Sequence, residues 1–64
     1  MMIGNRIKQL RKQKKLTQHE LAMAVGLDRT TITRYETGGT KITAEILPKI
    51  ADALNVPIAK LFEL

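Results

Sequence analysis

A glycine-centred turn between two capped helical segments constrains this chain more than any other feature. Thr17 and Glu20 have the spacing of a capping box, which predicts a helix that begins directly after Thr17. Gly26 is placed to end that helix, because glycine adopts the left-handed conformation at little cost. Asp28 is a suitable cap for the next helix. Such a short turn fixes the angle between the two helices and leaves one face of the second helix free.

Apolar residues at helical spacing predict three further helices. The first covers about residues 3–14, and a later one covers about residues 44–54, with Pro48 tolerable in its first turn. Pro57 opens a last short helix. No alternating strand pattern interrupts these segments. The sequence therefore predicts an all-α fold of five helices that forms one domain, residues 1–64.

Composition excludes several classes of protein. The chain of 64 residues has no cysteine, so neither a disulfide framework nor a thiolate metal site is possible. No apolar run approaches the roughly 20 residues of a membrane span, and no signal peptide is visible. We therefore expect a cytoplasmic protein without a membrane partner.

The sequence contains no recognisable catalytic motif. His19 and Glu20 begin the zinc pattern H-E-x-x-H, but Met23 stands where the second histidine is needed. Neither a nucleophile paired with a base nor a phosphate-cradling glycine loop is evident. We therefore expect no enzyme activity, no metal, no cofactor and no small-molecule ligand.

Positive charge is concentrated at the beginning of the chain. Eleven Lys and Arg against six Asp and Glu give a formal charge of +5. Six of the basic residues precede the first acid, namely Arg6, Lys8, Arg11, Lys12, Lys14 and Lys15. Clustered basic charge is typical of proteins with a polyanionic partner, and it is equally compatible with a solvated helix face.

The helix after Asp28 presents a basic and hydroxylated face. Helical periodicity turns Ile32 and Tyr35 inward. It turns outward a set of polar residues that contains no acid, namely Arg29, Thr30, Thr33, Arg34 and Thr37. Arginine binds guanine O6 and N7 in bidentate fashion, and a threonine methyl packs on the thymine methyl. This face therefore fits the major groove of DNA, although a plain solvated face would also be polar.

Arg11 and Glu36 each lie at the edge of the apolar stripe of their helix. If the two helices pack together, the two side chains can form a partly buried ion pair. The alternative is that both side chains extend to water, as charged residues usually do.

The segment 16–38, LTQHELAMAVGLDRTTITRYETG, resembles the lambda-repressor-like, Cro/XRE helix-turn-helix family. The ending, with Leu54-Asn55-Val56-Pro57 and Leu61-Phe62, is similar to the usual close of that family. The resemblance covers nearly the whole chain. It implies a compact five-helix domain that binds double-stranded operator DNA, generally as a two-fold dimer.

The resemblance also implies roles for individual residues. Together with the outward phase of Thr33, it gives the predicted base-reading residues Arg29, Thr30, Thr33 and Arg34, although relatives have Thr31 and Thr33 nearer the backbone. The predicted phosphate contacts are Gln18, Thr31, Thr37, Gly38, Thr40, Lys41 and Arg11. The pair Arg11 and Glu36 is implied to be a structural salt bridge beside the DNA backbone.

Apolar side chains at the end of the chain exceed what a short helix needs to cover its own core. They predict a homodimer interface of Ile58, Leu61, Phe62 and Leu64, unless they all seal the first and fourth helices. The predicted function is that of a transcriptional regulator, in particular a repressor that binds a pseudo-palindromic operator. The alternative is a protein-interaction module or antitoxin that uses the same fold to bind a protein partner.

Overall fold

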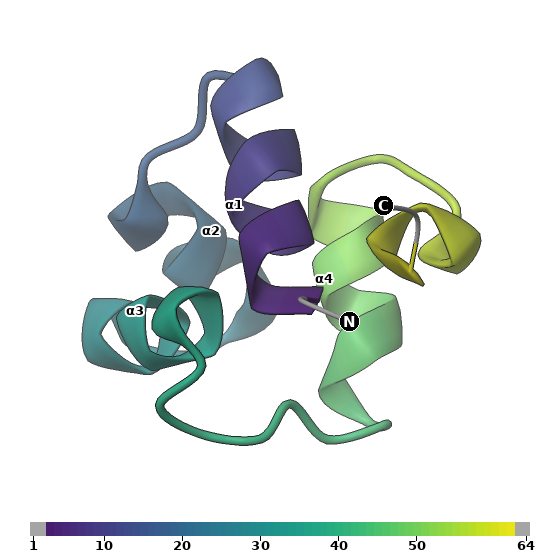
Figure 1. Ribbon diagram of the computed structural model, residues 1–64. Helices are drawn as coiled ribbons and strands as arrows, with labels where there is room; N and C mark the ends of the chain where they lie inside the picture. Colours follow the sequence, from purple (N-terminus) through teal and green to yellow (C-terminus); the bar gives the residue numbers. More distant parts are fainter. Residues whose placement is uncertain (1–2, 63–64) are drawn as a thin grey trace.

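The computed structural model of the chain describes residues 3–62, which contain four α-helices and one 3-10 helix (Figure 1). Their bounds are α1 Ile3–Gln13, α2 Gln18–Val25, α3 Arg29–Thr37, α4 Ile46–Ala53 and the 3-10 helix η1 Ile58–Phe62. The all-α fold is confirmed. The predicted five helical segments are present, and the last of them has the tighter 3-10 winding common in short segments.

The ends of α2 and the start of α3 are fixed as the sequence predicts. The Thr17 N–H donates to Glu20 Oε1 (2.8 Å), and the Glu20 N–H donates to Thr17 Oγ1 (3.0 Å). Gly26 has a left-handed φ of 76°. Asp28 Oδ1 accepts from the Thr31 N–H (2.8 Å). These local contacts set the direction of α3 relative to α2.

A single hydrophobic core joins all five elements. In the view of Figure 1, α2 and α3 lie on one side of α1, and α4 and η1 lie on the other. The α1 helix packs against α3 and η1, and α2 packs against α3 and α4. The largest fully buried side chains are Ile7, Leu21, Ile32, Ile50, Leu54 and Leu61. Each contributes on the order of 1.5–3 kcal/mol through burial.

The close approach of α1 and α3 depends on a glycine that sequence reasoning did not single out. A Cβ atom added to Gly4 would collide with the backbone carbonyl oxygen of Tyr35. Backbone at that separation leaves no room for a side chain, so glycine is required. Gly4 therefore allows the backbones of α1 and α3 to approach this closely.

Two further details differ from the sequence expectations. The α4 helix begins at Ile46 and not near Ala44, and its cap residue Glu45 makes no side-chain capping bond. Leu61 was predicted to face a second copy of the chain, but it is fully buried. Leu61 therefore belongs to the chain's own core. No helix within residues 3–62 has the length and apolar character needed to cross a membrane.

Candidate nucleic-acid interface

The two sides of α3 are chemically distinct. Ile32 is fully buried and Tyr35 is 8% exposed, as their predicted inward phase requires. Arg29, Thr30 and Arg34 are exposed on the opposite side. Their side chains make no hydrogen bond within the described part of the chain. This outer face therefore keeps its guanidinium and hydroxyl groups available to a ligand.

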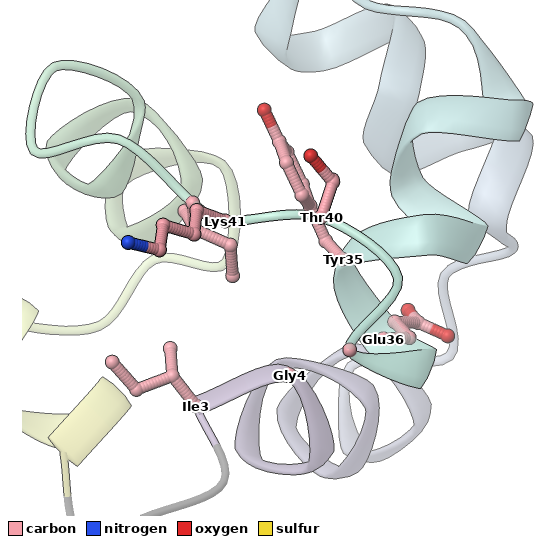
Figure 2. Close-up of a pocket in the computed structure, with 8 residues that line it drawn as sticks. Ile3, Gly4, Tyr35, Glu36, Thr40 and Lys41 are labelled. Carbon is pink, nitrogen blue, oxygen red and sulfur yellow. The ribbon is translucent and has the colours of Figure 1, made fainter.

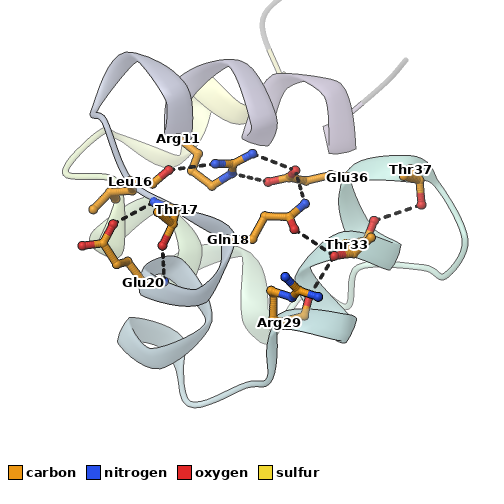
Figure 3. A network of polar contacts seen from close by, with 9 residues as sticks. All are labelled: Arg11, Leu16, Thr17, Gln18, Glu20, Arg29, Thr33, Glu36 and Thr37. Carbon is orange, nitrogen blue, oxygen red and sulfur yellow. Dashed lines mark hydrogen bonds and ion pairs between the residues drawn. The ribbon is translucent and has the colours of Figure 1, made fainter.

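The predicted ion pair between α1 and α3 is present (Figure 3). Arg11 Nε donates to Glu36 Oε2 (2.6 Å), and Arg11 Nη2 donates to Glu36 Oε1 (3.2 Å). Arg11 Nη1 also donates to the Leu16 carbonyl (2.7 Å). The side chains of Arg11 and Glu36 are only 9% and 1% exposed. A bidentate, buried pair of this kind fixes one helix against the other.

The same geometry limits the predicted phosphate contact of Arg11. Arg11 is buried and directs three of its five N–H groups to Glu36 and Leu16. Its role in the structure is therefore to join α1 to α3, and a contact of its remaining N–H groups with the DNA backbone stays a prediction.

Gln18 extends the ion pair towards the outer face of α3. Its Nε2 donates to Glu36 Oε1 (3.0 Å), and its Oε1 accepts from the Thr33 hydroxyl (3.0 Å) (Figure 3). The Thr33 hydroxyl also lies 3.0 Å from the Arg29 carbonyl oxygen. Sequence reasoning assigned Gln18 and Thr33 separately and missed this link, because residues 15 apart in the sequence give no periodic signal.

The loop after α3 is exposed and starts from a left-handed glycine. Gly38 has a φ of 79°, and the Gly39 N–H donates to the Arg34 carbonyl (2.8 Å). Thr37, Thr40 and Lys41 are exposed, as expected for phosphate contacts. A hollow of about 260 Å³ lies between this loop, the start of α1 and the end of α3.

Figure 2 shows the hydroxyl groups of Tyr35 and Thr40 pointing to the same side of the loop, while the Lys41 ammonium extends away from them. Tyr35 therefore contributes its ring to the core and its hydroxyl to the loop surface. The backbone and hydroxyl groups of this segment form a second polar region beside α3.

Two acids near the hairpin are held in their charged form by capping. The Thr31 hydroxyl and N–H lower the pKa of Asp28, and the Thr17 N–H lowers the pKa of Glu20. Glu20 lies in the first turn of α2 and Asp28 caps the start of α3, and the helix dipole favours negative charge at both positions. The carboxylates at α3 are thus used in capping by Asp28 and in the ion pair of Glu36, and the exposed side chains of the outer face remain basic or neutral.

The remaining predicted residues lie elsewhere. Ile58 and Phe62 of η1 are 42% and 41% exposed, and Leu64 lies outside the described residues. Met23 is 68% exposed on α2, and His19 is exposed in the first turn of the same helix. Residues 3–62 contain no group of three or more His, Cys, Asp or Glu side chains that could hold a metal ion.

Known proteins share both this fold and this sequence pattern. Antitoxin PezA of Streptococcus pneumoniae is 44% identical over 55 residues, which are 86% of this chain and 35% of PezA. The restriction-modification controller protein C.AhdI of Aeromonas hydrophila is 35% identical, with a TM-score of 0.91 over 94% of this chain and 87% of C.AhdI. The P22 c2 repressor in complex with a synthetic operator is 30% identical, with a TM-score of 0.86 over 95% and 92% of the two chains.

These features define a helix-turn-helix DNA-binding domain of the transcription-regulator class, which is not a class of enzymes. Residues 7–61 match the helix-turn-helix family HTH_3, and the chain belongs to that family. It spans about a third of the length of PezA, and between 17% and 81% of the length of other curated relatives. The predicted resemblance to the Cro/XRE family is confirmed.

Proposed function

We propose that this chain regulates transcription, as a repressor, by binding a pseudo-palindromic operator as a dimer with α3 in the major groove. The observation that carries the proposal is the outer face of α3, which is basic, hydroxylated and exposed on a helix whose inner face is fixed. A B-DNA major groove is about 12 Å wide and admits one α-helix. A rigid helix loses little conformational entropy when it enters that groove.

Base reading is assigned to Arg29, Thr30 and Arg34, with Thr33 beside them. The two arginines offer a bidentate pair of donors to guanine, whereas Thr30 offers a hydroxyl and a methyl. All of these side chains belong to one short helix of nine residues. They therefore contact only a few adjacent base pairs in each half of the operator.

Phosphate binding is assigned to groups on both flanks of α3. The loop supplies Gly38, Thr40 and Lys41, and the start of α2 supplies Gln18 through its N-terminal backbone N–H group. Thr37, at the end of α3, donates its hydroxyl to the Thr33 carbonyl at 2.9 Å and so has no side-chain proton for a phosphate. The side-chain amide of Gln18 is already bonded to Glu36 and Thr33. Thr31 donates its hydroxyl to Asp28 at 2.6 Å, so it keeps lone pairs and has no proton for a phosphate. Binding through the remaining groups weakens steeply with added salt.

Dimerisation is assigned to Ile58 and Phe62, the two large apolar side chains exposed on η1. With Leu61 buried, the proposed contact is smaller than the sequence suggested. Two copies related by a two-fold axis would place their α3 helices about 34 Å apart, in successive major grooves. Ile58→Ser with Phe62→Ser should then lower operator affinity without loss of the helical signal.

Selection of bound sequences from a random DNA pool tests this proposal. We expect a motif with two inverted half-sites whose centres lie about one helical turn apart. Sedimentation of the protein with that DNA should give two chains per site. Recovery of sequences without a shared motif, or of one half-site bound by one chain, would contradict the dimeric operator mechanism.

A protein-binding role is the second candidate, since one relative is named an antitoxin. Such a role would require apolar anchors on the surface that meets the partner. Thr30, Thr33 and Arg34 occupy the outer face of α3 and offer none. Met23 is the most exposed large apolar side chain among those described, and it lies on α2. Loss of partner binding in Met23→Ser with intact DNA binding would assign the two roles to different helices.

A further inference from the structure

The hydrogen bonds from Arg11 to Thr33 run in one fixed direction. A guanidinium only donates and a carboxylate only accepts, so Glu36 must accept from both Arg11 and Gln18. Gln18 can donate only through its amide nitrogen, which turns its carbonyl oxygen towards Thr33. That oxygen accepts from the Thr33 hydroxyl. The buried ion pair thus determines the orientation of a side chain at the edge of the DNA-facing helix.

This direction limits what Thr33 can offer to a ligand. Both groups within hydrogen-bonding distance of its hydroxyl are acceptors, Gln18 Oε1 and the Arg29 carbonyl, each at 3.0 Å. The single hydroxyl hydrogen is therefore used inside the protein. Guanine presents two acceptors in the major groove, and a phosphate oxygen is also an acceptor. Thr33 has no hydrogen to give to any of them.

Thr33 keeps its methyl group and the lone pairs of an oxygen that already lies between two protein acceptors. The hydroxyl of Thr30, three residues earlier on α3, is exposed and makes no hydrogen bond within residues 3–62. The two threonines therefore differ in chemistry although they share a residue type and a helix. An apolar methyl in the major groove packs favourably against the 5-methyl group of a pyrimidine.

We infer that Thr33 reads the 5-methyl group of a pyrimidine, in thymine or in 5-methylcytosine, and that Gln18 is the positioning residue that holds it. This inference rests on the proposed function, since it requires α3 to lie in the major groove. It also replaces the backbone-contacting role that the family resemblance implied for Thr33. Thr33 is then a determinant of specificity.

A methyl scan of the selected operator tests the inference. Each thymine is replaced in turn by deoxyuridine, which removes one methyl and leaves the hydrogen-bonding groups unchanged. We expect one position in each half-site where the wild-type affinity falls about fourfold, as loss of one buried methyl contact predicts. If the selected base is cytosine, addition of the 5-methyl group should raise affinity by a similar factor, which distinguishes the two sources of the methyl.

Protein variants identify the side chain that contacts the methyl-sensitive base. The measured quantity is the affinity for the thymine operator divided by the affinity for the uracil operator, called the thymine-to-uracil ratio. Thr33→Val keeps a methyl and should keep this ratio, whereas Thr33→Ser removes the methyl and should bring it to one. The matched variants Thr30→Val and Thr30→Ser should leave the ratio at this position unchanged. Melting of each variant, followed by circular dichroism, checks that it is folded.

Gln18→Met tests the positioning role. It should lower the thymine-to-uracil ratio at the Thr33 position and leave the ratios at other thymines unchanged, whereas a purely structural role would lower affinity for every site equally. A ratio that persists in Thr33→Ser but is lost in Thr33→Val would overturn the inference, because the hydroxyl would then be the reading group. If the pool yields a motif but no methyl effect in it depends on Thr33, this inference is wrong and the proposed function stands. If the pool yields no shared motif, the proposed function itself is wrong.

Discussion

The inner and outer faces of α3 differ in how much of their polar chemistry is already satisfied within the protein. On the inner side, Glu36 is 1% exposed in its side chain and accepts hydrogen bonds from Arg11 and Gln18. On the outer side, Arg29 and Arg34 are exposed and make no side-chain hydrogen bond with the described residues. Folding and recognition thus use separate groups of one short helix, and Gln18 links the two faces through Glu36 and Thr33. Substitutions on the two faces should therefore have separable effects.

Removal of the cation from the inner face should have the largest effect. Arg11→Met leaves the buried Glu36 carboxylate without its main partner, which costs about 3–5 kcal/mol of unfolding free energy. In a domain of this size such a loss approaches complete unfolding. The free energy of unfolding in urea measures it.

The double variant Arg11→Met with Glu36→Met is the control for that prediction. Replacement of both charges by apolar side chains of similar size is often neutral or stabilising. The double variant should therefore be more stable than Arg11→Met alone. A single variant that loses less than about 1 kcal/mol would mean that the pair is not buried in solution.

Substitution at the close backbone contact between Gly4 and Tyr35 should have the next largest effect on stability. Gly4→Ala forces a Cβ atom against the Tyr35 carbonyl and should cost about 1–3 kcal/mol of stability. Asn5→Ala, at the exposed neighbouring position, is the matched control and should cost almost nothing. If Gly4→Ala instead stabilises the protein, as its higher helix propensity alone would require, α1 and α3 do not approach this closely.

The outer face should show the opposite behaviour. Arg34→Ala should weaken operator binding by about 1–3 kcal/mol, relax preference at one base pair and change stability by less than about 0.5 kcal/mol. Lys49→Ala on α4 is the matched control, since it removes an exposed cation from another helix. Titrations with the operator and with single-base variants provide the measurement. An equal loss of affinity for every sequence would make Arg34 a phosphate contact.

The smallest expected effect is the loss of stability at low pH. The pKa values of Glu20 and Asp28 are lowered by capping hydrogen bonds from Thr17 and Thr31. A lowered pKa contributes stability above the unfolded-state pKa, and that stability is lost as the pH falls through the folded-state pKa. The melting temperature should therefore decline between about pH 5 and pH 3. Asp28→Asn with Glu20→Gln, which keep capping groups but do not titrate there, should decline less, and an equal decline would assign the effect to other groups.

Local signals in the sequence were sufficient for much of this structure. The capping box at Thr17, the left-handed Gly26 and the cap at Asp28 involve residues at most three apart, so spacing alone predicts them. The inward phase of Ile32 and Tyr35 follows from helical periodicity. The burial of Arg11 and Glu36 was foreseen as one of two possibilities.

Tertiary packing determined what the sequence could not predict. A side chain at position 4 is excluded only because the backbone of α3 crosses α1 at Gly4. Leu61 is buried only because η1 packs against α1 and α4. The orientation of Gln18 depends on Glu36, which is 18 residues away. The base and phosphate contacts remain predictions, because each depends on how the DNA is seated.

Nuclear magnetic resonance titration of the protein with its selected operator tests the central claim most directly. If α3 enters the major groove, the largest amide and side-chain shifts will occur at Arg29, Thr30 and Arg34, with smaller shifts along residues 37–41. The buried signals of Ile50 and Leu54 will hardly change. Shifts concentrated on Met23 or η1, with the outer face of α3 unaffected, would contradict the account.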